Sequence, residues 1–265
     1  LYNEVLDHNR INQLSSLLPA YQYQGSRVVI RGGKKPALLF SENGSYTLRK
    51  KDTEKTILVK GIEAPFSIGK TWQLHFQPDR GAPLQASMNE LISLHRHPDP
   101  GIRYYSGTVR YITSFIPPKQ LLTAGKYLEL DLGRVEIIAE VLLNGKNIGL
   151  LWKPPFRIPI HHQIKEGTNH LEIRVTNLWP NRLIGDEQLP DPDLFTAGAG
   201  ASGLESLSAG AIEKLPGWYM RNQPKPRDGR ICFSTWKHYT NQSPLLESGL
   251  IGPVAIYSSI EKTLD

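Results

Sequence analysis

The sequence predicts an all-β protein built as a β-sandwich, and three observations lead to this fold class. Short apolar or alternating runs recur about every eight to twelve residues with turn residues between them, which is typical of sandwiches and barrels. Gly (23 residues) and Pro (20 residues) are both frequent, which favours turns over long helices. Asn144-Gly145 stands between two apolar runs, and this dipeptide is the strongest short-range signal of a β-hairpin.

The first 61 residues are predicted to form a layer that is distinct from the sandwich. Residues 1–18 carry apolar side chains at the spacing of a short amphipathic helix, which Pro19 would end. Four short strands are expected after it, at residues 27–31, 37–40, 45–48 and 56–59. This is too little for an independent domain, so residues 1–61 are interpreted as the tail of an incomplete upstream domain or as a linker layer packed on the sandwich.

Residues 62–265 are predicted to form the sandwich itself. Strands are expected at residues 72–76, 104–115, 127–132, 137–143, 148–152, 157–160, 170–176, 230–235 and 254–258. Residues 180–228 interrupt this rhythm with a segment rich in Pro, Gly, Ala and Asp, in which residues 197–201 read AGAGA. A loop of such length inside a compact domain is usually functional or mobile.

Charge and composition argue against several classes of partner. The net charge is +6, and most of it lies in residues 1–60, which hold ten Lys and Arg against five Asp and Glu. This excess sits in turn-like runs without interleaved aromatic residues, so neither a nucleic-acid surface nor any nucleic-acid partner is expected. No apolar run approaches the ~18 residues that a membrane span needs. Cys232 is the only cysteine, which excludes an intrachain disulfide, and a buried inert thiol is expected.

Residues 66–257 resemble a known family of domains. The matching segments are HPDPGIRYYSGTVRY (97–111), LELDLGRVEIIAEVLLNGKNIGLLWKPPFRIPI (128–160), TNLWPNRLIGDE (176–187) and SGLIGPV (248–254), and ENGSYTL (42–48) is similar to the strand that leads into the domain. Together they resemble the C-terminal jelly roll of glycoside hydrolase family 106, the α-L-rhamnosidase type, and more distantly the sugar-binding domain of family 2 glycosidases. The resemblance implies a galactose-binding-like jelly roll. A shared fold does not by itself establish activity.

Independent catalysis by this chain is not expected. Glycoside hydrolysis uses two carboxylates about 5–9.5 Å apart on a rigid frame, and in the resembled family the catalytic groups belong to an upstream barrel. The candidate carboxylates here are adjacent or lie in the irregular segment: Asp186, Glu187, Asp191, Asp193 and Glu205. The pairs His95/His97 and His161/His162 lack the spacing of a zinc site. No cofactor is expected, although jelly rolls often hold a structural Ca²⁺; the sequence carries no loop signature for one.

Sugar binding is the stronger expectation. Sugar rings stack on aromatic faces, and planar polar side chains satisfy their hydroxyl groups. Such residues gather at both ends of the irregular segment, and the candidate carbohydrate-binding residues are Trp179, Asn181, Arg182, Asp186, Trp218, Trp236 and His238. Two other interpretations stay open: Trp152, Trp179 and Trp236 could be core aromatics, and Arg182 could brace the loop by pairing with Asp186 or Glu187. Trp72 is expected in the core.

The predicted function is therefore that of a non-catalytic accessory or carbohydrate-binding β-sandwich of a large glycoside hydrolase of the α-L-rhamnosidase type. The alternatives are a free-standing carbohydrate-binding module and a purely structural spacer. The expected partner is a glycan or the upstream catalytic domain of the same polypeptide. The resemblance further implies a periplasmic, secreted or cell-surface protein that takes part in polysaccharide degradation.

Overall fold

The computed structural model describes residues 27–29, 37–50, 53–69, 71–190, 211–212, 214–226 and 229–263. The helix expected within residues 1–18 lies outside these ranges, as do the 197–201 segment and the candidate carboxylates Asp191, Asp193 and Glu205. The described residues form a β-sandwich, so the predicted all-β fold class is confirmed.

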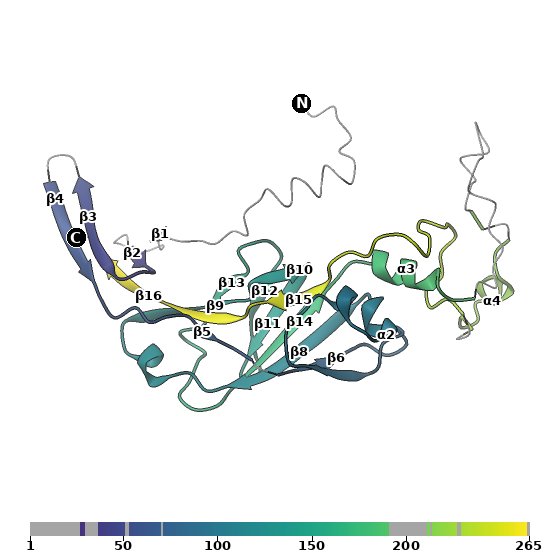
Figure 1. Cartoon of the computed structure of the whole chain (residues 1–265), viewed down its shortest axis with the longest axis horizontal. Coiled ribbons are helices and arrows are strands. Elements are labelled where there is room, and N and C mark those ends of the chain that lie inside the picture. The colour runs from purple at the N-terminus through teal and green to yellow at the C-terminus, as the bar shows by residue number, and fades with distance from the viewer. Residues whose placement is uncertain are drawn as a thin grey trace, which may run out of the picture.

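Two six-stranded sheets make up the sandwich (Figure 1), and their named strands pair antiparallel. The first sheet runs in the order β1 (Arg27–Val29), β2 (Ala37–Phe40), β16 (Ala255–Thr263), β9 (Lys126–Asp131) and β13 (Arg157–Pro159), and β5 (Phe66–Ser67) also pairs with β16. The second sheet runs in the order β12 (Lys146–Leu151), β11 (Ile138–Leu143), β14 (Asn169–Thr176), β8 (Thr108–Phe115), β6 (Trp72–His75) and β7 (Gln85–Met88).

Two smaller pairs of strands and several short helices complete the fold. The pairs are β3 (Gly44–Lys50) with β4 (Thr53–Val59) and β10 (Arg134–Glu136) with β15 (Gly249–Gly252). The helices are η1 (Leu94–Arg96), α2 (Pro100–Arg103), η2 (Lys119–Leu122), α3 (Pro180–Asp186) and α4 (Gly217–Met220). The β3–β4 hairpin and the α3–α4 region lie at opposite ends of the sandwich in Figure 1.

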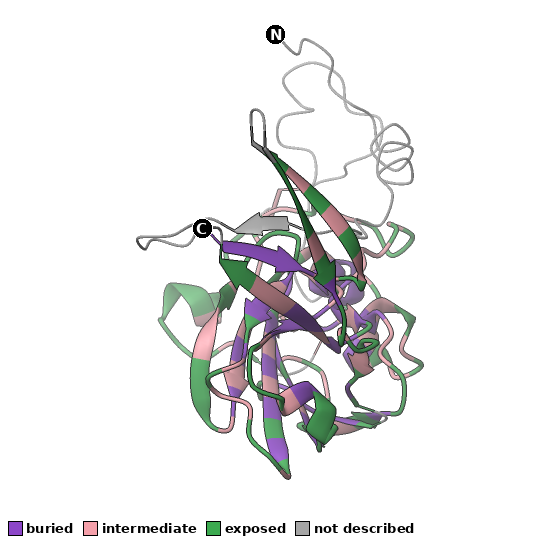
Figure 2. Cartoon of the chain, turned by 90° about the vertical axis from the view of Figure 1, so that its left-hand side faces the viewer, coloured by how far each residue is buried: buried purple, intermediate pink, exposed green. Residues whose placement is uncertain are grey.

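The core fills the space between the two sheets because successive side chains of a strand point to opposite faces. In β8 every second residue is buried, and the same alternation holds in β14. The inner faces contribute large apolar side chains from both sheets, among them Leu74, Val109, Tyr111, Leu130, Ile173 and Ile256. Figure 2 shows the buried positions between the sheets, whereas most of the β3–β4 hairpin is exposed or half-buried. Trp72 is 1% exposed, which confirms its predicted place in the core.

Two of the strands before residue 61, β1 and β2, belong to the first sheet of the sandwich. Residues Ala37 to Phe40 of β2 pair with Ile260 to Thr263 of β16, so β2 continues the first sheet. Both interpretations of residues 1–61, as the tail of an upstream domain or as a linker layer, stay predictions. The domain boundary at residues 61/62 stays a prediction.

The structure corrects three expectations about secondary structure. Residues 230–235, which were expected to form a strand, are irregular. Their backbone donors bind a side chain instead, because the N–H groups of Ile231 and Cys232 donate to the Asp186 carboxylate. The segment 180–228, expected to be a loop throughout, begins with α3 and contains α4. The long strand expected at 104–115 starts only at Thr108.

Candidate functional site: the Trp179 pocket

Helix α3 provides the framework on which the predicted site residues are placed. Pro180 occupies its first turn, where the missing N–H of proline costs no hydrogen bond. Asn181, Ile184 and Asp186 are buried in the fold. Trp179, at the N-cap, remains 48% exposed. The helix is thus anchored through its polar residues and presents Trp179 at the surface.

Three of the seven predicted sugar-binding residues are buried and bound within the protein. Asn181 is 2% exposed, and its amide both donates to the Leu246 carbonyl at 2.7 Å and accepts the Leu246 N–H at 2.8 Å. Arg182 is 3% exposed and forms an ion pair with Asp186, with 3.2 Å between Nε and Oδ1. The Nε–H is not aligned for a hydrogen bond in that contact. These side chains brace the fold, which agrees with the alternative interpretation of Arg182 as a loop brace.

Asp186 connects α3 to residues 230–237, which lie beyond the irregular segment in the chain. Its carboxylate is fully buried and accepts hydrogen bonds from the N–H groups of Ile231 at 2.9 Å and Cys232 at 2.8 Å. The neighbouring Glu187 accepts from Arg230 at 2.8 Å and lies 3.3 Å from Lys237. Both carboxylates are therefore occupied in holding residues 230–237 against the helix.

A pocket of about 450 Å³ opens beside this brace. It is lined by Asp79, Arg80, Trp179, Leu183, Ile231, Cys232, Phe233, Ser234 and His238. The two exposed residues among the sequence-based candidates, Trp179 and His238, thus share one hollow although they lie in different parts of the chain. The lining combines apolar surface, a hydroxyl group, an imidazole, a carboxylate and a guanidinium, which is the mixture that holds a polar ligand with apolar faces.

The remaining tryptophans lie near the pocket or away from it. Trp218 packs edge-on against Phe233, a lining residue, with 5.1 Å between ring centroids. Trp236 is half-buried beside a bridge to Ala211 and does not line the pocket. Trp152 is 65% exposed and does not line the pocket either. The interpretation of Trp152 and Trp179 as core aromatics is therefore wrong. The prediction that the site residues bind carbohydrate stays a prediction.

Sequence reasoning missed Asp79 and Arg80. They belong to the turn Pro78-Asp79-Arg80-Gly81 that comes after β6, about a hundred residues before Trp179 in the chain. The guanidinium carbon of Arg80 lies 4.9 Å from the centroid of the Trp179 ring. The turn itself could be recognised from Pro, Asp and Gly, but nothing in its spacing indicated that it would meet α3.

The Cys232 thiol in the pocket wall is unreactive. Burial, and then the charge of the nearby Asp186, raise the pKa of Cys232 to about 11. The thiol therefore stays protonated at neutral pH, and the nucleophilic thiolate is not available. This agrees with the expected inert thiol, although Cys232 is half-buried rather than fully buried.

A serine–histidine contact elsewhere in the fold has a structural explanation. Ser93 Oγ and His95 Nδ1 are 2.6 Å apart. Ser93 is only 3% exposed, and its hydroxyl also accepts the Ser248 N–H at 2.8 Å. Burial, followed by Arg96 and Arg134, lowers the pKa of His95. The buried hydroxyl ties η1 to the start of β15 and offers no nucleophile to a substrate.

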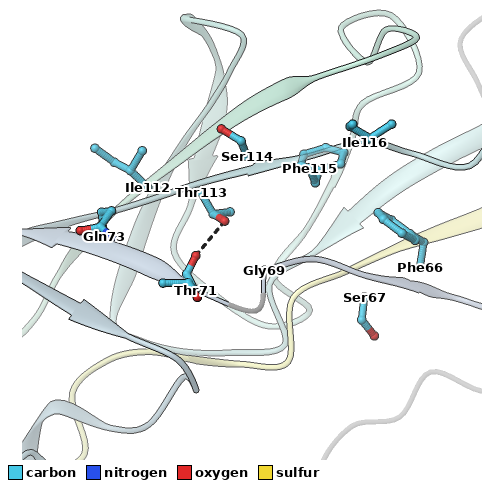
Figure 3. A pocket seen from close by; sticks show the side chains of 10 residues that line it. All are labelled: Phe66, Ser67, Gly69, Thr71, Gln73, Ile112, Thr113, Ser114, Phe115 and Ile116. Carbon is cyan, nitrogen blue, oxygen red and sulfur yellow. Dashed lines mark hydrogen bonds between the residues drawn. The ribbon is translucent and has the colours of Figure 1, made fainter.

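A second hollow, of about 590 Å³, lies where β6 and β8 run side by side (Figure 3). It is lined by Phe66, Ser67, Gly69, Thr71, Gln73, Ile112, Thr113, Ser114, Phe115 and Ile116. The Thr113 hydroxyl donates to the Thr71 carbonyl across it at 3.0 Å. None of these lining residues is charged, so this hollow has no group for acid–base chemistry.

Neither a metal cluster nor a membrane-spanning helix is found in the part of the chain that the structure describes. No three His, Cys, Asp or Glu side chains among the described residues gather closely enough to hold a metal ion. Likewise, none of the described helices is long and apolar enough to cross a bilayer.

Comparisons with known proteins give the class of this domain. The chain is 42% identical over 207 residues to a Formosa agariphila protein with the provisional name beta-glucuronidase, and the match covers 78% of this chain and 17% of that protein. Its structure is similar to that of a rhamnosidase from Novosphingobium sp. PP1Y, with a TM-score of 0.57 and 27% identity over 88% of this chain and 23% of the other. No protein-family model matches the chain. The chain is a β-sandwich domain related to glycoside hydrolases. It spans less than a quarter of the length of either of these relatives.

Proposed function

We propose that the chain is an accessory β-sandwich of a glycoside hydrolase of the α-L-rhamnosidase type, that it is not itself catalytic, and that it binds glycan at the Trp179 pocket. One observation carries the binding role: Trp179 and His238 line the same hollow together with Arg80, Phe233 and Ser234. The assignment to the rhamnosidase type, family 106, is supported by the similarity of most of the chain to the Novosphingobium rhamnosidase.

The chemistry of the pocket supports a sugar rather than a wholly apolar ligand. A pyranose has apolar C–H faces and a rim of hydroxyl groups. The Trp179 and Phe233 rings provide surfaces for the C–H faces. Ser234, His238 and Arg80 provide hydrogen-bonding groups for the rim. A pocket of about 450 Å³ accommodates one or two sugar units.

A non-catalytic role is supported by the state of the carboxylates. Asp186 is fully buried, and Glu187 is paired with Arg230 and Lys237. A general acid or nucleophile must reach the glycosidic oxygen or the anomeric carbon, and neither carboxylate is exposed to do so.

The test of binding is isothermal titration calorimetry with a panel of plant and algal oligosaccharides, using the wild type, Trp179→Ala and Trp152→Ala. We expect saturable binding by the wild type and at least a tenfold loss with Trp179→Ala, which corresponds to about 1.4 kcal/mol. Trp152→Ala is the matched control, because Trp152 is also exposed but does not line the pocket. If no glycan binds, or if Trp179→Ala binds as the wild type does, the proposal is wrong and a structural spacer is the better description.

We further propose a catalytic domain of the same polypeptide as the second partner, and a periplasmic, secreted or cell-surface location. The lengths of the two relatives support this, since each has room for a further domain. The test is the reading frame upstream of Leu1, which is expected to encode a barrel with a catalytic carboxylate pair and a secretion signal. If the reading frame encodes no such domain, the better interpretation is a free-standing carbohydrate-binding module.

A further inference from the structure

We infer that the Trp179 pocket recognises an acidic sugar, a uronate, and that Arg80 holds its carboxylate. The inference rests on the carbohydrate-binding function proposed above and names the class of sugar for the same pocket.

The guanidinium of Arg80 lies over the Trp179 ring and has no ionic partner among the residues that the structure describes. Its carbon lies 4.9 Å from the centroid of the Trp179 ring. Stacking engages the flat face of the guanidinium, whereas its N–H donors point outward in the plane. Among the described residues, Arg80 has neither a hydrogen bond nor an ion pair. The donor edge is therefore available to a ligand in the pocket.

Three other cations near the pocket each contact a carboxylate of the protein. Arg182 pairs with the buried carboxylate of Asp186. Arg230 and Lys237 both contact the carboxylate of Glu187. Among the described lining residues, Arg80 is the only arginine or lysine that could bind an anion, and His238 is the only histidine.

The turn that carries Arg80 is held close to the pocket wall. Gly81 has a φ of +85°, and a Cβ atom at this position would lie 2.5 Å from Ile231 Cδ1 and 2.9 Å from Arg182 Nη1. Only glycine allows this approach. Because the turn is packed against Ile231 and stacked on Trp179, the Arg80 fork loses little further freedom when a ligand binds.

The guanidinium of Arg80 determines how the carboxylate of the sugar is oriented. Arginine binds a planar carboxylate through two parallel N–H donors. The sugar ring attached to that carboxylate then lies over the apolar lining of Leu183, Ile231 and Phe233. A neutral sugar would use the same apolar lining but would bring no carboxylate to the N–H donors of Arg80.

Removal of the Asp79 charge should change uronate affinity in the opposite direction to removal of the Arg80 charge. Its carboxylate lines the same pocket and has an interaction of its own within the protein. A nearby negative charge opposes the binding of an anion, so its removal should strengthen the binding of a uronate. Asn tolerates the backbone at this position, where φ is +59°.

The experiment compares methyl β-D-glucuronide with methyl β-D-glucoside, which differ in one carboxylate, by calorimetry or by ligand-observed NMR. The proteins are the wild type, Arg80→Gln, Arg80→Lys, Asp79→Asn and Trp179→Ala, with Arg49→Gln as the control. The Arg49 side chain is 77% exposed on the β3–β4 hairpin, at the other end of the sandwich (Figure 1).

We expect the wild type to bind the glucuronide at least tenfold more tightly than the glucoside at low salt, with a preference that shrinks as ionic strength rises. Arg80→Gln should erase the preference, Arg80→Lys should retain part of it, and Asp79→Asn should increase it. Arg49→Gln should behave as the wild type, and Trp179→Ala should weaken the binding of both sugars.

Four outcomes would overturn the inference. Equal affinity for the two sugars, unaffected by Arg80→Gln, would remove the carboxylate assignment but leave the proposed glycan binding intact. Glucuronide binding that survives Trp179→Ala would place the acidic site elsewhere. Tighter binding of methyl β-D-glucoside 6-sulfate than of the glucuronide would reassign the anion to a sulfate. Failure to bind any sugar would overturn the proposed function together with the inference.

Discussion

The carboxylate of Asp186 accepts a hydrogen bond of 2.8 Å from the backbone N–H of Cys232, 46 residues further along the chain. This contact joins the end of α3 to the segment that forms one wall of the Trp179 pocket. The Ile231 N–H donates to the same carboxylate at 2.9 Å. The pocket therefore depends on a buried charge that does not itself line it.

Asp186→Asn should unfold the protein more easily and abolish the pocket. The amide would turn donors toward groups that are themselves donors, and Arg182 would be left buried without its counter-charge. Removal of one partner of a buried ion pair costs about 3–5 kcal/mol, and we expect a loss of this size in urea unfolding. Glu90→Gln, at an exposed position, should change stability by less than about 0.5 kcal/mol. A loss below about 1 kcal/mol for Asp186→Asn would contradict the bracing role.

Two tryptophans should respond differently to the same substitution. Trp72 is 1% exposed in the core, whereas Trp152 is 65% exposed. Trp72→Ala should lower the free energy of unfolding by about 3–5 kcal/mol, because it loses apolar burial and leaves a cavity. Trp152→Ala should stay within about 0.5 kcal/mol of the wild type. Chemical denaturation of the two variants checks this. Similar losses for both would mean that Trp152 is covered in solution.

Low pH should lower the free energy of unfolding, because Glu172 on the second sheet becomes protonated. Its carboxylate accepts from Arg110 Nε at 2.8 Å, from Arg110 Nη2 at 3.0 Å and from Arg174 Nε at 2.6 Å. The hydrogen bond from Arg110, with support from Arg174, lowers the pKa of Glu172 from 4.5 to about 2. A lowered folded-state pKa stabilises the fold above the unfolded-state value, and this stabilisation is lost as the pH falls from about 4.5 to about 2.

Glu172→Gln should therefore show a shallower loss of stability across that pH range than the wild type. The difference should be about 1 kcal/mol or less, since the pair is near the surface and is screened by solvent. Urea unfolding at about pH 2.5 and about pH 6, either side of most of this titration, measures it, with Glu54→Gln on the exposed hairpin as the control. Parallel pH profiles for the wild type and Glu172→Gln would show that the pair contributes nothing.

The isolated chain should not hydrolyse glycosides. The two described carboxylates that the sequence analysis considered for catalysis, Asp186 and Glu187, are buried or ion-paired, so neither can act as a general acid on a sugar in the pocket. We expect no turnover of aryl α-L-rhamnosides or aryl β-D-glucuronides by purified protein. Turnover that disappears with Glu187→Gln would contradict this, because that substitution removes a candidate carboxylate and leaves the Asp186 brace in place.

The alternation of apolar residues was sufficient to predict most strands. In β8 and β14 the pattern persists over eight residues, and the structure places both strands in the middle of the second sheet. Sequence reasoning failed for residues 230–235, whose central apolar run Ile231-Cys232-Phe233 was taken as a strand. Their N–H groups are taken by the Asp186 side chain instead of a neighbouring strand, and no local pattern reveals such a long-range acceptor.

The candidate site was predicted in part. Trp179 and His238 were recognised by residue type and by their position at the two ends of the irregular segment, and they line one pocket. Asn181, Arg182 and Asp186 carry the same polar groups, yet they are buried. Residue type shows what a side chain can bind, but the helix face on which it lies decides whether it meets solvent or the core.

The sequence by itself determined the all-β class, most strands of the sandwich and the relation to glycoside hydrolases, because each depends on local periodicity, turn chemistry or contiguous motifs. Only the tertiary structure decided that Arg80 stacks on Trp179 at 4.9 Å and that Asp186 holds residues 231 and 232. These contacts join segments about fifty to a hundred residues apart. Their formation depends on how the two sheets pack and where the chain leaves them, and neither the spacing nor the composition of the sequence specifies that geometry.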